Sequence, residues 1–244
     1  RFEREATLWT HLDHPHILPF IGIYRADGYI HLTSPFMENG NLAHYIETNP
    51  ATERSSFLFE SADAVTYLHS KGIVHGDIKA RNILISASRH AILCDFGLAK
   101  WAHSVTGSAS KGMGTVRWQS PELLKGQSRC FASDTYAFGI TIAEVLSGKI
   151  PFAEFSGWTE GAIIHAVLSG ERPALEPAHS PTGKPYERLW NMAASCWIEE
   201  PNFRPAMAEV LASLRPSGEL QSSVARTQSE YLQGTNRTIV RCKS

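Results

Sequence analysis

The spacing of apolar residues in the first part of the chain predicts one helix and two strands. In residues 1–12 they recur at steps of three and four with charged residues between them, which predicts an amphipathic helix that ends before Pro15. Two short apolar or alternating runs, 17–24 and 29–37, lie on either side of the turn signal Ala26-Asp27-Gly28. We therefore predict an antiparallel strand pair.

The pattern of the remaining chain is mainly helical. Helical spacing is present at 55–70, 134–147, 160–169, 187–197 and 205–214. Segment 134–147 is apolar on nearly every side, so we expect a buried central helix, because a helix without a polar face is unfavourable at a surface. Two short β-like runs, 82–85 and 90–94, flank a turn. Segment 217–244 is rich in Ser, Gln, Thr, Gly and Arg and has little periodicity, so we predict a loose tail.

This order of elements predicts an α+β fold with two lobes. A helix and strands come first and a mainly helical region follows. We place the smaller lobe in residues 1–36 and the larger lobe in 37–216. A functional site is expected where the two lobes meet.

Composition limits the classes of binding partner and the cellular compartment that we expect for this chain. The chain has 23 Lys and Arg against 24 Asp and Glu, so its charge does not indicate a nucleic-acid or anionic-membrane partner. Its four cysteines lack C-x-x-C spacing, which favours reduced thiols inside the cell. No apolar run reaches the roughly 18 residues of a membrane span, and no leader opens the chain. We expect a cytoplasmic or nuclear protein, with its oligomeric state left open.

Two motifs carry the strongest chemical signal. The octapeptide His75-Gly76-Asp77-Ile78-Lys79-Ala80-Arg81-Asn82 is followed by Asp95-Phe96-Gly97. Phosphoryl transfer needs carboxylates for Mg²⁺, a carboxylate that orients the attacking hydroxyl, and a cation near the γ-phosphate. Either motif alone occurs by chance in loops. Together, in this order and spacing, they indicate a phosphoryl-transfer site.

With these motifs the chain resembles the protein kinase superfamily over about residues 2–215, and most closely its tyrosine-kinase-like branch of serine/threonine kinases. The stretch from Ser34 to Leu42 and the sequence Trp118-Gln119-Ser120-Pro121-Glu122 resemble expanded fungal members of that branch. The resemblance implies a kinase fold with two lobes, and transfer of the γ-phosphate of ATP to serine or threonine in a protein substrate.

The resemblance implies catalytic roles for four residues of the two motifs. Asp77 resembles the catalytic-loop base, which accepts or orients the proton of the acceptor hydroxyl. Asn82 and Asp95 resemble the two Mg²⁺ ligands. Lys79 resembles the lysine that neutralises charge on the transferring phosphoryl group.

A second group of residues is implied to bind ATP. Glu5 lies at the helix position whose carboxylate pairs with the ATP-binding lysine of the family. Ser34 resembles the gatekeeper and Leu84 resembles the floor under the adenine ring. The hinge, whose backbone bonds adenine in the family, would consist of Pro35, Phe36 and Met37. Apolar walls with a few polar anchors are typical of such a pocket.

A third group is implied to support the site. Glu122 is expected to form an ion pair with Arg204 that anchors the substrate-binding segment. Asp134 is expected to bond the backbone of the catalytic loop, because a buried carboxylate needs partners. Gly97 completes the Asp-Phe-Gly motif. An apolar spine between the lobes is expected from the rings of Trp9, Phe20, His75 and Phe96.

Two residues favour serine or threonine over tyrosine as the acceptor. Lys79 stands where most receptor-type tyrosine kinases have alanine. Thr115 matches the threonine that contacts the base and the lysine in serine/threonine kinases. The sequence Ala80-Arg81-Asn82 is instead typical of tyrosine kinases.

The chain departs from the family pattern in two places. Gly76 stands where most kinases have the arginine that grips a phosphorylated activation segment, so we expect that switch to be weak. A glycine-rich phosphate loop and a Val-Ala-x-Lys strand do not precede Glu5 in this sequence, so we expect an incomplete small lobe and no turnover by these 244 residues alone. Two alternatives stay open: a kinase whose first strands lie upstream, or a silent pseudokinase or fragment that scaffolds partner proteins.

Overall fold

The computed structural model describes residues 2–26, 28–104, 115–155, 157, 159–174 and 186–215, and the predicted tail at 217–244 lies outside them. The α-helices are α1 (Phe2–Trp9), α2 (Leu42–Thr48), α3 (Ser55–Ser70), α4 (Pro121–Leu124), α5 (Phe131–Ser147), α6 (Glu160–Leu168), α7 (Glu187–Cys196) and α8 (Met207–Leu214). The strands are β1 (Gly22–Ala26), β2 (Tyr29–Thr33), β3 (Ile73–Val74), β4 (Ile83–Ile85), β5 (Ala91–Leu93) and β6 (Lys100–Trp101).

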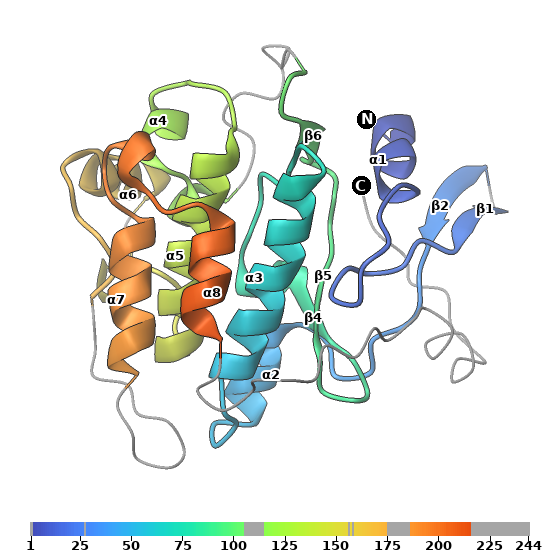
Figure 1. Cartoon of the computed structure of the whole chain (residues 1–244), viewed down its shortest axis with the longest axis horizontal. Helices are drawn as coiled ribbons and strands as arrows, with labels where there is room; N and C mark the ends of the chain where they lie inside the picture. The colour runs from blue at the N-terminus through green and yellow to red at the C-terminus, as the bar shows by residue number, and fades with distance from the viewer. Residues whose placement is uncertain are drawn as a thin grey trace.

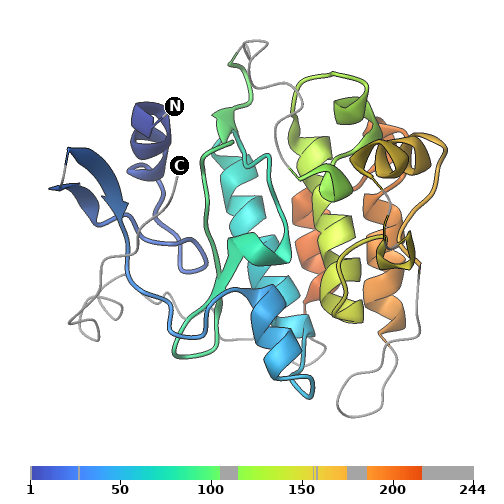
Figure 2. The same ribbon diagram turned by 180° about the vertical axis from the view of Figure 1, so that it is seen from behind.

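Helix α1 and the β1–β2 hairpin lie on one side of the molecule, and the other helices form a larger body beside them (Figures 1 and 2). The two strands pair antiparallel, from Gly22 opposite Thr33 to Ala26 opposite Tyr29. The chain between α1 and β1 joins the larger body through a parallel bridge of Ile17 with Leu93. This arrangement confirms the α+β fold with two lobes.

The predicted central helix is α5, and the structure confirms that it is buried along almost its whole length. Every residue from Ser133 to Leu146 is buried. Helix α5 packs against α3 and α7, and α3 packs against α8 (Figure 1). The helix ends at Gly148, whose φ of 68° is the left-handed conformation that closes a helix without a Cβ penalty.

Some predicted boundaries were wrong. The run at 17–24 contributes a strand only from Gly22 onward, because the preceding residues cross toward β5. Helix α2 was not among the segments for which the apolar spacing predicted a helix. The Asn41 side chain caps this helix by accepting a hydrogen bond from the backbone N–H of His44 at 3.1 Å. The two-residue strands β3 and β6 are too short to produce a periodic pattern.

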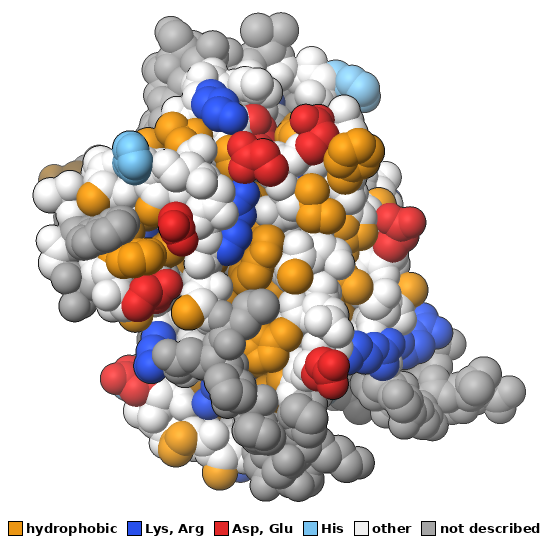
Figure 3. Space-filling model, turned by 90° about the vertical axis from the view of Figure 1, so that its left-hand side faces the viewer, with side chains coloured by type: hydrophobic (Ala, Val, Ile, Leu, Met, Phe, Trp, Pro, Cys, Tyr) orange, Lys and Arg blue, Asp and Glu red, His pale blue; other side chains and the backbone are white. Residues whose placement is uncertain are grey.

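The surface is mixed in character. Acidic and basic side chains both occur on the face shown in Figure 3, among polar and apolar ones. On the β1–β2 hairpin the side chains of Ile23, Tyr24 and Tyr29 are exposed. Within the part of the chain that the structure describes, no helix is long and apolar enough to cross a membrane.

Candidate active site

The loop that follows β3 is held on the first turn of α5 by one buried carboxylate. Asp134 accepts hydrogen bonds from the backbone N–H groups of His75 and Gly76, each at 2.8 Å. The Nε2 atom of His69 lies 3.0 Å from the same carboxylate. Three polar partners offset the cost of burying this charge, and the two backbone hydrogen bonds join the loop to the central helix.

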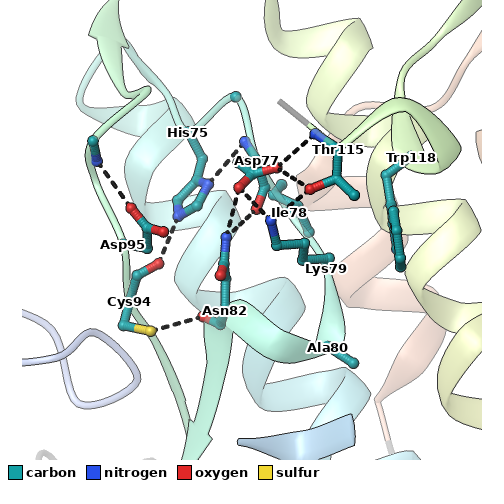
Figure 4. Close-up of polar contacts among 12 residues, drawn as sticks. His75, Asp77, Ile78, Lys79, Ala80, Asn82, Cys94, Asp95, Thr115 and Trp118 are labelled. Carbon is teal, nitrogen blue, oxygen red and sulfur yellow. Dashed lines mark hydrogen bonds and ion pairs between the residues drawn. The ribbon is translucent and has the colours of Figure 1, made fainter. Parts of the chain in front are cut away.

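Asp77 is at the centre of a dense polar network (Figure 4). Its Oδ2 atom accepts from Lys79 Nζ at 2.6 Å and from Asn82 Nδ2 at 3.0 Å. Its Oδ1 atom accepts from the hydroxyl of Thr115 at 3.3 Å. The structure thus brings together four residues that come from the catalytic-loop motif and from a segment more than thirty positions later.

The network keeps Asp77 ionised. Burial opposes ionisation, but hydrogen bonds and charge from Lys79, with smaller contributions from His75 and Asn82, hold the pKa of Asp77 below its ordinary value. A carboxylate with a lowered pKa is a weak base and a good hydrogen-bond acceptor. Asp77 is therefore suited to orient a hydroxyl rather than to remove its proton in advance.

Lys79 connects Asp77 to Thr115. Its Nζ atom donates to the Asp77 carboxylate and to the Thr115 hydroxyl, both at 2.6 Å. Thr115 precedes the short 3₁₀ helix η3 (Val116–Trp118), so Lys79 ties the loop after β3 to the segment that leads into α4. The ammonium group therefore places a positive charge directly beside the Asp77 carboxylate.

Asn82 and Asp95 lie at the ends of the paired strands β4 and β5. The backbone N–H of Cys94 donates to the carbonyl oxygen of Asn82 at 2.9 Å, which joins the two motifs. The Asn82 side chain donates through Nδ2 to the carbonyl oxygen of Asp77 at 2.8 Å, so a metal ligand from Asn82 would be its side-chain oxygen. Asp95 is exposed and has a positive φ of 65°. A carboxylate and an amide oxygen are ligands that suit Mg²⁺.

Gly97 supports Asp95, because its backbone N–H donates to Asp95 Oδ1 at 3.3 Å. A strained backbone conformation held by a local hydrogen bond is common at functional sites.

Four rings connect the small lobe to the catalytic loop. Trp9 of α1 lies 5.3 Å from Phe20 and 5.7 Å from Phe96, measured between ring centroids. Phe96 in turn lies 5.5 Å from His75 in an edge-on arrangement. His75 Nδ1 accepts from the N–H of Asp77 at 3.2 Å, so this ring links the apolar stack to the backbone of the central carboxylate.

The residues assigned to ATP come from α1, from β4 and from the connection between β2 and α2. Ser34, Pro35 and Met37 are buried in the connection from β2 to α2, and Phe36 in the same connection is exposed. Leu84 is half-buried on β4 and forms a bridge with Asn41. Glu5 is half-buried on α1.

The expected ion pair between Glu122 and Arg204 is present and buried. The guanidinium donates to both carboxylate oxygens, at 2.6 and 2.8 Å. Arg204 also donates to the carbonyl oxygens of Ile198, Glu199 and Ala132. This two-point geometry fixes α4, and with it the end of the segment that contains Thr115.

The comparison with protein families decides the identity of this site. Residues 1–214 match the family described as protein tyrosine and serine/threonine kinase. The chain is a protein kinase domain. Enzymes of this family generally use ATP and Mg²⁺, and the side-chain oxygens of Asn82 and Asp95 are of the kind that Mg²⁺ binds.

Two curated relatives show the range of similar kinase domains. The chain is 30% identical over 217 residues to the RasGEF domain-containing serine/threonine-protein kinase X of Dictyostelium discoideum, which covers 87% of this chain and 22% of the relative. It is 28% identical over 247 residues to the serine/threonine/tyrosine-protein kinase HT1 of Arabidopsis thaliana, covering 98% of this chain and 61% of that relative. The kinase domain therefore spans less than two thirds of either protein.

Glu144 is a charged residue of the site that sequence reasoning missed. This carboxylate is buried in α5, and its Oε2 atom accepts from the backbone N–H of Ala80 at 2.9 Å and from Trp118 Nε1 at 3.0 Å. It therefore joins the catalytic loop to η3. A single acid late in an otherwise apolar helix was the signal that could have identified it, because such an acid must have partners.

Glu144 leads to a prediction about the pH dependence of stability. Burial raises the pKa of Glu144 to about 7 from an ordinary 4.5. Between these pH values the unfolded chain releases a proton that the folded kinase domain retains, so this group lowers the free energy of unfolding as pH rises. Both hydrogen bonds end on one oxygen, which the amide of Glu144→Gln can reproduce.

We compare the free energy of unfolding of Glu144→Gln with that of the wild type at pH 5 and at pH 8. The difference should shift in favour of the variant by on the order of 3 kcal/mol between the two pH values. Urea unfolding at both pH values would measure this difference. Glu187→Gln, on an exposed position of α7, is the control and should change little. Parallel pH profiles for wild type and Glu144→Gln would contradict the prediction.

Proposed function

We propose that this kinase domain transfers the γ-phosphate of ATP to serine or threonine side chains of a protein substrate. The observation that supports it most strongly is the Asp77 carboxylate held between Lys79 and Thr115, with Asn82 on the same oxygen as Lys79. To position an acceptor hydroxyl, a carboxylate must be ionised and must be held in one direction, and Asp77 meets both conditions.

In the proposed reaction the substrate hydroxyl donates a hydrogen bond to Asp77. Its oxygen forms a bond with the γ-phosphorus, while the bond from that phosphorus to the oxygen bridging the β- and γ-phosphates breaks. The hydroxyl proton passes to Asp77 as the new bond forms, and from there to solvent. Lys79 neutralises negative charge on the group in transfer from its place beside the carboxylate.

Asn82 and Asp95 would hold Mg²⁺ through their side-chain oxygens, and the metal ion would supply charge neutralisation on the phosphates of ATP. The adenine ring would lie between the two lobes, with Ser34 as gatekeeper and Leu84 below the ring. Hydrogen bonds to the adenine would come from the backbone at 35–37, and Glu5 would pair with an ATP-binding lysine.

We further propose that the domain belongs to the tyrosine-kinase-like branch, is similar to the expanded fungal members of that branch, and acts in the cytoplasm or nucleus. The serine/threonine part of this assignment is supported by Thr115, which contacts both Asp77 and Lys79, the arrangement that the resemblance associates with serine/threonine kinases. The names of both curated relatives include serine/threonine kinase activity.

The experiment is a transfer assay on the protein produced from its full coding sequence. With Mg²⁺, ATP labelled in the γ-phosphate and a generic basic protein, we expect labelled phosphoserine or phosphothreonine after acid hydrolysis. Asp95→Ala should abolish the label, and Asp13→Asn, at an exposed position, should leave it unchanged. Stable folding and partner capture with no transfer by the wild type would contradict the proposal and favour a silent scaffold. Label on phosphotyrosine alone would contradict the acceptor assignment.

A further inference from the structure

Gly76, which replaces the arginine typical of the family, is in a conformation and an environment that exclude a side chain. Its φ is +83°, a region that L-residues rarely adopt. A Cβ atom placed there would lie 2.6 Å from Cδ and 3.0 Å from Nε of Arg129, and 3.1 Å from the carbonyl oxygen of Leu98. The space that a side chain at residue 76 would need is therefore occupied by the stem of an arginine from another part of the chain.

Arg129 reaches this position from the connection between α4 and α5. It is only 6% exposed, which is unusual for a charged side chain and requires polar partners. One of them is the carbonyl oxygen of Gly76, to which Arg129 Nε donates at 3.3 Å. The same connection leads to Asp134, which accepts from the N–H of Gly76 at 2.8 Å. The backbone of Gly76 is thus held at both its N–H and its carbonyl group.

The carbonyl group of Gly76 belongs to the peptide unit that leads into Asp77. A peptide unit is planar, so the direction of this carbonyl also sets the direction of the Asp77 N–H. That N–H donates to His75 Nδ1 at 3.2 Å. Rotation of the peptide unit would break this bond and change the backbone angle φ of Asp77. Lys79 and Asn82 constrain the carboxylate at the other end of the side chain.

We propose that Arg129 is a positioning residue for Asp77. By holding the Gly76–Asp77 peptide, it keeps the carboxylate in the direction that the acceptor hydroxyl needs. The inference rests on the proposed phosphotransferase function. Gly76 and Arg129 act as a pair: the absent side chain at residue 76 makes room for Arg129, and Arg129 brings a guanidinium to the loop from outside it.

Substitutions at Arg129 test the positioning role in the transfer assay. Arg129→Met keeps an unbranched stem and removes the donor, and we expect kcat to fall by roughly ten- to a hundredfold, the range for one hydrogen bond from a charged donor, while KM for ATP stays unchanged. Arg129→Lys retains a donor and should recover part of the loss. Equal kcat for the wild type and Arg129→Met, per folded molecule, would overturn the proposal and leave Arg129 a packing residue.

A double-mutant cycle tests the pairing independently of activity. Gly76→Ala should lower the thermal stability of the wild type strongly, and should lower that of the Arg129→Ala variant less, because the collision with Cδ is then absent. The strain of a positive φ is common to both backgrounds and cancels in the cycle. Additive effects would overturn the pairing. If the wild type transfers no phosphate, the proposed function fails and the catalytic part of this inference with it, while the cycle still decides whether the two residues are coupled.

Discussion

Replacing Asp77 with asparagine is expected to lower kcat by about two to four orders of magnitude, the range for a positioned acid–base group, and to leave the affinity for ATP nearly unchanged. The carboxylate acts on the acceptor hydroxyl and has no assigned contact with the nucleotide. Both of its oxygens accept hydrogen bonds, Oδ2 from Lys79 and Oδ1 from Thr115. An amide can accept on only one side and cannot receive the proton.

The measurement is steady-state phosphate transfer together with nucleotide binding, for Asp77→Asn and for the exposed control Asp13→Asn. The control should behave as the wild type in both assays. If Asp77→Asn transfers phosphate at a rate within a few-fold of the wild type, Asp77 does not have the assigned role. Loss of ATP binding would instead show that the residue acts on the nucleotide.

Replacing Arg204 with methionine is expected to destabilise the kinase domain by about 3–5 kcal/mol, because it leaves the buried Glu122 carboxylate without its partner. The guanidinium also donates to three backbone carbonyl groups and lies 5.0 Å from the centroid of the Tyr136 ring. For a domain of this size the melting temperature should fall by on the order of 10 °C.

The measurement is thermal unfolding of Arg204→Met and of the control Arg188→Met. Arg188 is an arginine on an exposed position of α7. The control should change the free energy of unfolding by no more than about 0.5 kcal/mol. The double variant Glu122→Gln with Arg204→Met removes the unpaired charge and should recover part of the loss. Equal melting temperatures for the two single variants would show that the ion pair contributes nothing to stability.

The sequence predicted the structure best where apolar residues recur at a regular spacing, and where residues that are close in the chain act together. The helical spacing at 55–70 coincides with α3, and the apolar segment at 134–147 lies within the buried helix α5. The motif from His75 to Asn82 was recognisable because its chemistry needs several residue types at fixed, short separations. The second motif, Asp95-Phe96-Gly97, follows after the strand pair β4–β5.

Short helices and strands were harder to predict where a single contact with another residue decides where they form. Helix α2 begins because the Asn41 side chain accepts the N–H of His44, and a short polar segment without such a partner would be read as a turn. Strands β3 and β6 exist because they pair with each other, Val74 opposite Lys100, although neither has a pattern of its own. In both cases the stabilising contact is not a periodic feature of the sequence.

The amino-acid sequence alone determined the two-lobed fold, the buried helix and the identity of the motif residues, because hydrophobic periodicity and motif spacing are properties of nearby positions. Only the tertiary structure decided which distant groups fix the site. Gly76 in the sequence indicated a missing guanidinium, and the fold supplies one from Arg129. Glu144 looked like one acid in an apolar helix, and packing places Ala80 and Trp118 on it. Such pairings arise when the chain folds back on itself, since burial then requires each charge to find a partner wherever the fold provides one.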